Sequence, residues 1–123
     1  MVAAHLESGA RAEQCALAYL EVHGVRILAR NLRCRRDELD IVGWDGDTVA
    51  LIEVRQRRSR DFGGALASVT AHKQRKLIRA ARYLLQRDAR LRGRRLRFDV
   101  IAVEGHPDGA HEIVWIKDAF RPA

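Results

Sequence analysis

The chain has 123 residues, of which 47% are apolar and 32% charged, and its formal net charge is +7 at neutral pH. Such values are typical of one folded domain with its own core and exclude a disordered chain, so we expect a single domain over residues 1–123. No apolar run approaches the ~20 residues that a membrane-spanning helix needs. The first residues also lack the regions of a signal peptide, which indicates a cytoplasmic protein without a membrane partner.

Apolar residues with helical spacing predict a first helix from Ser8 to His23, and Gly24 is well placed to end it. A strand over residues 25–33 follows. Residues 37–44 and 48–56 are rich in aliphatic side chains and flank the turn-forming segment "WDGDT", so they predict a β-hairpin.

The second half of the chain begins with residues 57–67, which predict a basic loop with two glycines that is mobile without a ligand. Ser68 predicts the N-cap of a long helix that ends at about Arg92. Two further strands are expected over residues 96–103 and 112–120. The order α-β-β-β-α-β-β predicts an α/β fold, with a mixed sheet flanked by helices.

Positive charge is concentrated in this second half. Between Arg55 and Arg97 there are 15 Lys or Arg residues against two acidic residues, a local balance of +13, whereas the rest of the chain has a balance of −6. Twenty of the 23 basic residues are arginines, whose planar guanidinium suits bidentate contacts with phosphate. This pattern favours nucleic acid as the partner, DNA before RNA, and a solvated basic surface is the alternative. The residues expected to bind it come from the predicted loop and from the exposed side of the predicted long helix: Arg57, Arg58, Arg60, Arg75, Arg79 and Arg82.

Two carboxylates interrupt the apolar pattern of the predicted hairpin. Asp40 lies in its first strand and Glu53 in its second, and side chains alternate across a strand. A two-residue turn at Asp45-Gly46 would put Asp40 diagonal to Glu53, and a four-residue loop would put the two directly opposite each other. Either register clusters the carboxylates on one face, whereas a three-residue loop would separate them.

Unpaired carboxylates at this separation repel each other and are costly to desolvate. A divalent cation removes this cost, and hard oxygen ligands suit Mg²⁺ or Mn²⁺, which take only one or two protein carboxylates. The alternative is structural, with Arg55 and other arginines forming ion pairs with the two acids. The residues alone leave both interpretations open.

The order of these residues resembles that of a known family. Asp40, followed thirteen residues later by Glu53-Val54-Arg55, resembles the core motif of the PD-(D/E)xK nucleases. Nearly the whole chain resembles the YraN-like family of small bacterial proteins, which are similar to archaeal Holliday-junction resolvases. The segments that carry this resemblance are Glu13 with "ALAYL", "RN" at Arg30-Asn31, "DELDIV", "LIEVRQRRS", "FGGALASVTAHKQRKL", "RFDVIAV" and "VWIKDAF".

The resemblance implies a restriction-endonuclease-like fold and a metal site. By position, Asp40 and Glu53 would be metal ligands, with the carbonyl of Val54 as a third. Glu13 would reach the site from the first helix, although a solvated acid near the helix start is the alternative. Arg55 stands where the nuclease motif has a lysine. An arginine stays protonated and cannot act as a base, but it can stabilise charge on a phosphate.

Lys73 lies four residues before Leu77, on the inward side of the predicted long helix. It could substitute for the missing lysine, and a structural lysine whose stem lies along apolar surface is the alternative. The implied activity is hydrolysis of phosphodiester bonds in nucleic acid with Mg²⁺ or Mn²⁺, with branched DNA as one candidate substrate. A non-catalytic nucleic-acid-binding module of the same fold and a domain that binds an acidic protein are the other candidates. The residues predict no oligomeric state.

Overall fold

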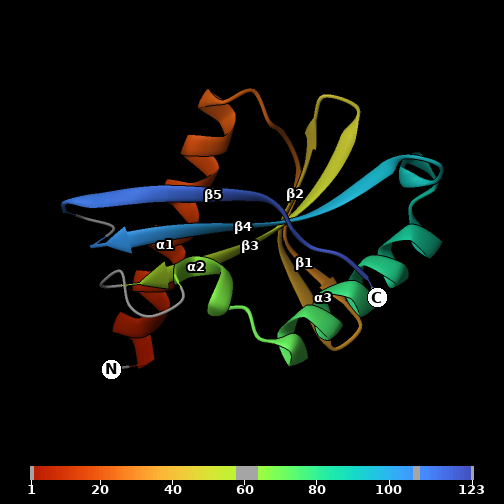
Figure 1. Ribbon diagram of the computed structural model, residues 1–123. Coiled ribbons are helices and arrows are strands. Elements are labelled where there is room, and N and C mark those ends of the chain that lie inside the picture. The colour runs from red at the N-terminus through yellow and green to blue at the C-terminus, as the bar shows by residue number, and fades with distance from the viewer. Residues whose placement is uncertain (1, 58–63, 107–108, 123) are drawn as a thin grey trace.

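The computed structural model describes residues 2–57, 64–106 and 109–122, and of residues 2–8 only the backbone. Five strands form one sheet in the order β1-β2-β3-β4-β5. Figure 1 shows this sheet together with the helices that pack beside it. The elements, in chain order, are α1 (Val2–Val22), β1 (Arg26–Cys34), β2 (Asp37–Asp45), β3 (Thr48–Arg57), α2 (Gly64–Ala67), α3 (Ala71–Arg87), the 3-10 helix η1 (Ala89–Leu91), β4 (Arg95–Gly105) and β5 (His111–Phe120).

The sheet is mixed because one of its four strand pairs is parallel. β3 pairs with β4 in parallel, and the chain between them contains α2 and α3, whereas the other neighbours are antiparallel. A parallel pair needs such a crossover connection, and antiparallel pairs need only a turn. The predicted α/β fold, a restriction-endonuclease-like mixed sheet flanked by helices in the order α-β-β-β-α-β-β, is confirmed.

Helices cover both faces of the sheet. Leu20 of α1 packs with Ile52 and Ile101 in one core, and Leu77 of α3 packs with Leu51 in a second core. Consecutive residues of a strand point to opposite faces, so these two cores lie on opposite sides of the sheet. Apolar positions on both faces explain why the central strands read as nearly continuous apolar runs. No helix within the described part of the chain is long and apolar enough to cross a membrane.

The predicted bounds of the helices are wrong at three ends. α1 begins six residues before Ser8, at Val2. α3 begins at Ala71 rather than after Ser68, because the hydroxyl of Thr70 accepts a hydrogen bond from the backbone N–H of Lys73 at 3.2 Å. It ends at Arg87 and not near Arg92, where the chain turns into η1.

The predicted loop over residues 57–67 is only partly a loop, because its last four residues form α2. The hydroxyl of Ser68 donates a hydrogen bond to the carbonyl of Ala65 in α2, which occupies the group that was expected to cap the longer helix. Residues 58–63 lie outside the described residues. The predicted mobility of the loop and the positions of Arg58 and Arg60 therefore stay predictions.

The β2–β3 turn sets the register of the two carboxylate-bearing strands. Asp45 pairs with Thr48, so the two-residue turn is Gly46-Asp47, one residue later than Asp45-Gly46. Gly46 has a φ of +62°, and a positive φ at the first loop residue alone is typical of a type II′ turn. Trp44 then lies opposite Val49, which is the register that a four-residue loop would also give. This register brings the two carboxylate positions directly opposite each other.

Candidate carboxylate site at the end of the sheet

Asp40 and Glu53 lie where β2 and β3 separate. The last backbone pair between the two strands is Ile41 with Ile52, and the same register continued by one residue places Asp40 opposite Glu53. The backbone N–H of Val54 donates a hydrogen bond of 2.9 Å to Oδ2 of Asp40. The backbone hydrogen bonds between β2 and β3 end before this point, and the side chain of Asp40 thus provides the acceptor for the N–H of Val54.

Glu53 is a buried carboxylate with incomplete partners. Glu53 is 4% exposed. Its Oε2 lies 3.5 Å from Nη1 of Arg55 and 3.7 Å from Nζ of Lys73. Its Oε1 is buried without a hydrogen-bond partner. Burial, followed by the negative charge of Asp40, raises the pKa of Glu53 from 4.5 to about 7, although Lys73 and Arg55 oppose this shift. The ion-pair interpretation therefore accounts for one oxygen of this carboxylate and leaves the other bare.

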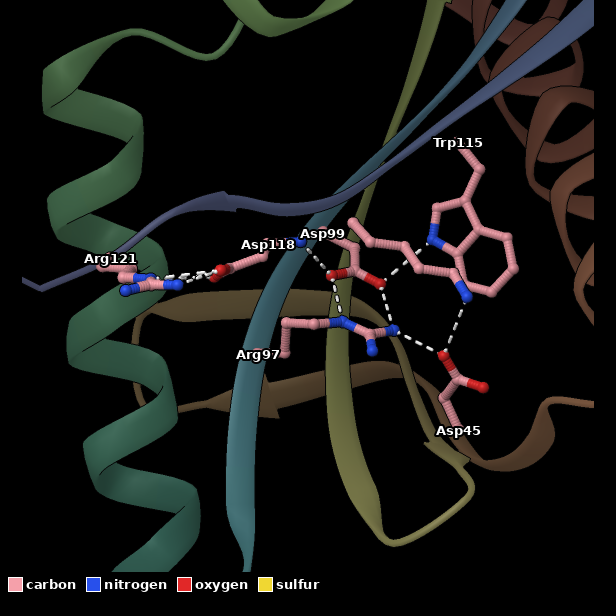
Figure 2. A network of polar contacts seen from close by, with 7 residues as sticks. Asp45, Arg97, Asp99, Trp115, Asp118 and Arg121 are labelled. Atoms are coloured by element: carbon pink, nitrogen blue, oxygen red, sulfur yellow. Dashed lines mark hydrogen bonds and ion pairs between the residues drawn. The ribbon is translucent and has the colours of Figure 1, made fainter.

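Another buried carboxylate in the same sheet provides an internal comparison. Asp99 in β4 accepts two hydrogen bonds from Arg97, one from the indole N–H of Trp115 and one from the backbone N–H of Asp118, all between 2.8 and 3.0 Å (Figure 2). Arg97 also donates to Asp45 at 2.8 Å. The chain therefore satisfies Asp99 completely, on the α1 face of the sheet. Glu53, on the other face of the neighbouring strand, has no comparable set of donors.

Glu13 approaches the site from α1. Its side chain is 13% exposed, and its Oε1 is buried without a hydrogen-bond partner, with Nη2 of Arg30 at 3.6 Å. Burial first and the charge of Asp40 second raise the pKa of Glu13, which places the two carboxylates within electrostatic reach. Because α1 begins at Val2, Glu13 lies well inside the helix and is not the solvated acid of a helix start.

A cleft of about 400 Å³ opens beside these groups, and Glu13, Arg30, Asn31 and Asp40 are among the residues that line it. Asn31 was missed as a site residue. Its φ of +51° is one that asparagine tolerates better than most residues. Its side chain forms a hydrogen bond with Glu13 that opposes, without cancelling, the upward shift of the Glu13 pKa caused by burial and Asp40. The sequence did contain a signal for this residue, because Asn31 interrupts an otherwise strand-forming segment and asparagine is depleted in strands.

The two cations of the site converge on one oxygen. Lys73 lies in the first turn of α3, and Arg55 follows Glu53 on β3. Both side chains are little more than a third exposed, so each keeps contact with solvent. Lys73 is thus more than a stem along apolar surface, because its ammonium group reaches the buried carboxylate.

The three arginines predicted on the exposed side of the long helix, Arg75, Arg79 and Arg82, differ in their partners. Arg79 donates two hydrogen bonds to Asp37, at 2.8 and 2.9 Å, and is therefore engaged by a protein carboxylate. Arg75 and Arg82 are exposed. The three arginines therefore do not act as equivalent free cations.

Of the predicted loop arginines, only Arg57 can be placed. It is half-buried at the end of β3, and its Nη1 is buried without a hydrogen-bond partner. Arg57 thus lies four residues beyond Glu53 on the same strand. Its charge is close to the carboxylate end of the sheet.

The donor set of the site fits a hard divalent cation. Within the part of the chain that the structure describes, no group of three or more His, Cys, Asp or Glu side chains is arranged to hold a metal ion. A pair of carboxylates with a bare, buried oxygen is nevertheless what Mg²⁺ or Mn²⁺ accepts, since these ions keep several water ligands. The predicted role of the Val54 carbonyl stays a prediction.

Comparison with known proteins assigns the chain to a family. The model of the family described as "Uncharacterised protein family UPF0102" matches residues 12–103, which include every described residue of the carboxylate site. The chain belongs to the UPF0102 family. The predicted membership of the YraN-like family is confirmed, because this is the same group.

UPF0102 relatives match almost end to end. A UPF0102 protein of Pseudomonas fluorescens strain Pf0-1 is 47% identical over 94% of this chain and 94% of its own length. One from Stutzerimonas stutzeri strain A1501 is 49% identical over 93% and 94%, respectively. A third, from Nitrosococcus oceani, is 42% identical over 97% and 95%. These names state a family and no activity.

Proposed function

We propose that this UPF0102 protein is a metal-dependent nuclease that hydrolyses phosphodiester bonds in nucleic acid, with DNA preferred over RNA as the substrate. The observation that carries the proposal is the bare, buried Oε1 of Glu53 in a position directly opposite Asp40. The same chain surrounds Asp99 with four donated hydrogen bonds. Among the residues that the structure describes, the buried carboxylate oxygens without a hydrogen-bond partner belong to Glu13 and Glu53, both at this end of the sheet, and a ligand is the simplest reason for them.

The identity of the ligand follows from the donors. Two neighbouring carboxylates, one of which has a buried oxygen that no protein donor reaches, favour a cation that is small and doubly charged. Oxygen donors select Mg²⁺ or Mn²⁺ over softer metals. When bound, such an ion would supply positive charge for the developing charge on a phosphate and would lower the pKa of water. Asp40 and Glu53 would hold it, and Glu13 would border it from α1.

The remaining residues of the site suit a phosphate substrate. Lys73 and Arg55 both point toward Glu53 and keep about a third of their side chains exposed, so they can also contact an incoming anion. Their role would be to bind the phosphate and stabilise its charge, as preorganised cations do in phosphoryl transfer. Arg55 does not accept a proton from water, because a guanidinium stays protonated in proteins.

The surroundings of the site support a polyanionic substrate. Arg57 continues β3 beyond the carboxylates, and Arg75 lies exposed on α3 two residues after Lys73. The net charge of +7 would increase the local concentration of an anionic polymer. The resemblance of the Asp40 to Arg55 segment to the PD-(D/E)xK nucleases and resolvases points in the same direction and makes branched DNA a substrate to test.

A second candidate function is a nucleic-acid-binding module of the same fold without catalysis. The specific observation in its favour is Arg55, which replaces the lysine of the nuclease motif. The two candidates differ in their dependence on a metal ion. Hydrolysis requires the Asp40 and Glu53 pair to hold a cation, whereas binding through arginines does not.

The test is a cleavage assay on labelled duplex, four-way branched and single-stranded DNA, and on RNA, with Mg²⁺, Mn²⁺ or EDTA. We expect the parent protein to cleave at least one substrate only with metal. Asp40→Asn should abolish cleavage while DNA binding in EDTA persists. The matched control is Asp47→Asn, which removes the same charge from an exposed turn residue and should leave cleavage unchanged. Binding without cleavage under all these conditions would favour the second candidate, and full cleavage by Asp40→Asn would refute the proposed site.

A further inference from the structure

A second positively charged region lies beside the β1–β2 turn. A cleft of about 520 Å³ opens there between the turn and α3, and Figure 1 shows the two elements next to each other. The charged residues of its lining are four arginines and one aspartate: Arg35, Arg36, Arg79, Arg82 and Asp37. The formal balance of the lining is therefore +3.

The aspartate and one arginine form a fixed part of this cleft. Asp37 is 9% exposed, and Arg79 donates to both of its carboxylate oxygens. The bidentate hydrogen bond from Arg79 lowers the pKa of Asp37, so this carboxylate is ionised and its charge is matched by Arg79. The pair connects β2 to α3 and holds the two sides of the cleft together.

The other three arginines have their charge available. Arg35, Arg36 and Arg82 are exposed, and none of the three forms an ion pair with another residue that the structure describes. They come from two elements, the β1–β2 turn and α3, that are far apart in the sequence. A solvated basic face needs no such convergence on one cleft.

The backbone conformation at Arg35 indicates a functional role for its side chain. Cys34 pairs with Asp37, so Arg35 and Arg36 form a two-residue turn, and Arg35 has a φ of +61°. Glycine or asparagine is favoured at such a position, and a residue with a long side chain is disfavoured. The guanidinium carbon of Arg35 lies 5.9 Å from the ring centre of Tyr83 on α3, a cation–π distance that directs it toward the cleft. A conformation that costs energy and still carries an arginine suggests a functional reason.

We propose that this cleft binds phosphate groups of a nucleic-acid backbone and anchors the substrate away from the carboxylate site; the inference rests on the nucleic-acid substrate of the proposed function. Guanidinium groups bind phosphate oxygens in a bidentate way, which suits arginine better than lysine. α3 connects the two regions, since Lys73 contacts Glu53 and Arg82 lines the cleft. Nine residues of helix span ~13–14 Å. Phosphates follow one another at about 3.4 Å along the axis of a duplex strand, so the cleft would lie roughly four phosphates from the reacting bond.

The experiment measures DNA binding in EDTA, where cleavage is absent, by fluorescence anisotropy of a labelled duplex between 50 and 200 mM salt. The test variant combines Arg35→Gly, Arg36→Ala and Arg82→Ala. Glycine suits the positive φ of Arg35, so the turn is retained. Each phosphate contact contributes about 0.9 to the slope of log K against log salt, so we expect the slope to decrease by up to ~2.7 and affinity to fall more than tenfold at low salt.

The matched control combines Arg26→Ala, Arg94→Ala and Arg95→Ala, which removes the same charge. Arg26 lies opposite Trp44, Arg94 stacks over Trp44, and Arg95 begins β4, so all three lie at the other end of the sheet. We expect the control to change the slope by less than about one contact. Circular dichroism and thermal melts establish that both triple variants are folded.

Three results would overturn the inference. Equal losses in the two triple variants would show that only total charge matters. Binding of polyglutamate as tight as that of DNA at equal charge would assign the cleft to an acidic protein instead. A parent protein that binds no DNA would refute the inference together with the proposed function. A different result would separate the two proposals. If the parent protein binds DNA but never cleaves it, and the test variant loses that binding, the cleft is supported and only the proposed hydrolysis is refuted.

Discussion

The replacement Glu53→Gln tests whether the buried carboxylate is a cost to the fold or a support for it. In the folded protein the pKa of Glu53 is raised to about 7, compared with an ordinary value of 4.5. One pKa unit corresponds to about 1.4 kcal/mol, so ionised Glu53 would lower the free energy of unfolding by about 3 kcal/mol. Glutamine has nearly the same shape and no charge, and it removes this cost. Arg55 and Lys73 remain hydrated in the variant, because each is more than a third exposed.

The sign of the pH dependence follows from the raised pKa. Well below pH 4.5 the group is protonated in both the folded and the unfolded chain, and the parent and Glu53→Gln should be equally stable. Between pH 4.5 and about 7 the unfolded chain releases the proton first, so the parent loses stability relative to the variant. At pH 8 the variant should be more stable by up to about 3 kcal/mol.

The assay is urea denaturation in EDTA at intervals from pH 5 to pH 8.5. The control is Glu38→Gln, which removes the same charge from an exposed residue of β2 and should change stability by less than ~0.5 kcal/mol. With millimolar Mn²⁺ at pH 8 the parent should gain stability and Glu53→Gln should not, since only a ligand that prefers the native state stabilises it. A variant less stable than the parent at pH 8, with no response of the parent to metal, would show that the carboxylate is structural and would refute this reasoning.

Two further substitutions test contacts that hold the sheet. Asp40→Asn keeps an acceptor for the backbone N–H of Val54 and should be as stable as the parent or more so, whereas Asp40→Ala should cost about 1–3 kcal/mol by leaving that donor unpaired. Equal losses in the two variants by urea denaturation would contradict this role of Asp40. Arg97→Met should cost about 3–5 kcal/mol, because it removes the cation that neutralises fully buried Asp99. A loss below about 1 kcal/mol would mean that the remaining donors are sufficient.

The sequence by itself determined the order of the strands and the main helices. Apolar alternation and turn residues are local signals, and they placed all five strands within two residues of their observed ends. They left open whether Asp40 and Glu53 share a face, because a two-residue or a four-residue loop clusters them and a three-residue loop separates them. The observed register decides that they lie opposite each other. The resemblance to the YraN-like family, confirmed by the UPF0102 match, came from short segments spread over nearly the whole chain.

Helix ends were predicted less well, because several residues can cap a helix and the choice depends on tertiary contacts. Ser68 and Thr70 are both good caps by type. The hydroxyl of Ser68 donates to the carbonyl of Ala65 in α2, which leaves Thr70 to cap α3. No local pattern in the chain separates these two outcomes.

The tertiary structure alone decided which charges meet. Lys73 reaches Glu53 from twenty residues away, and Asp37 binds Arg79 from forty-two residues away. Such pairs depend on how α3 crosses the sheet, a geometry set by the packing of the whole core rather than by neighbours in sequence. For the same reason, only the folded chain shows that Asp99 is completely satisfied and that one oxygen of Glu53 is not. The apolar pattern around Asp40 and Glu53 predicts carboxylates within the sheet, but the donors available to each carboxylate are fixed by long-range packing.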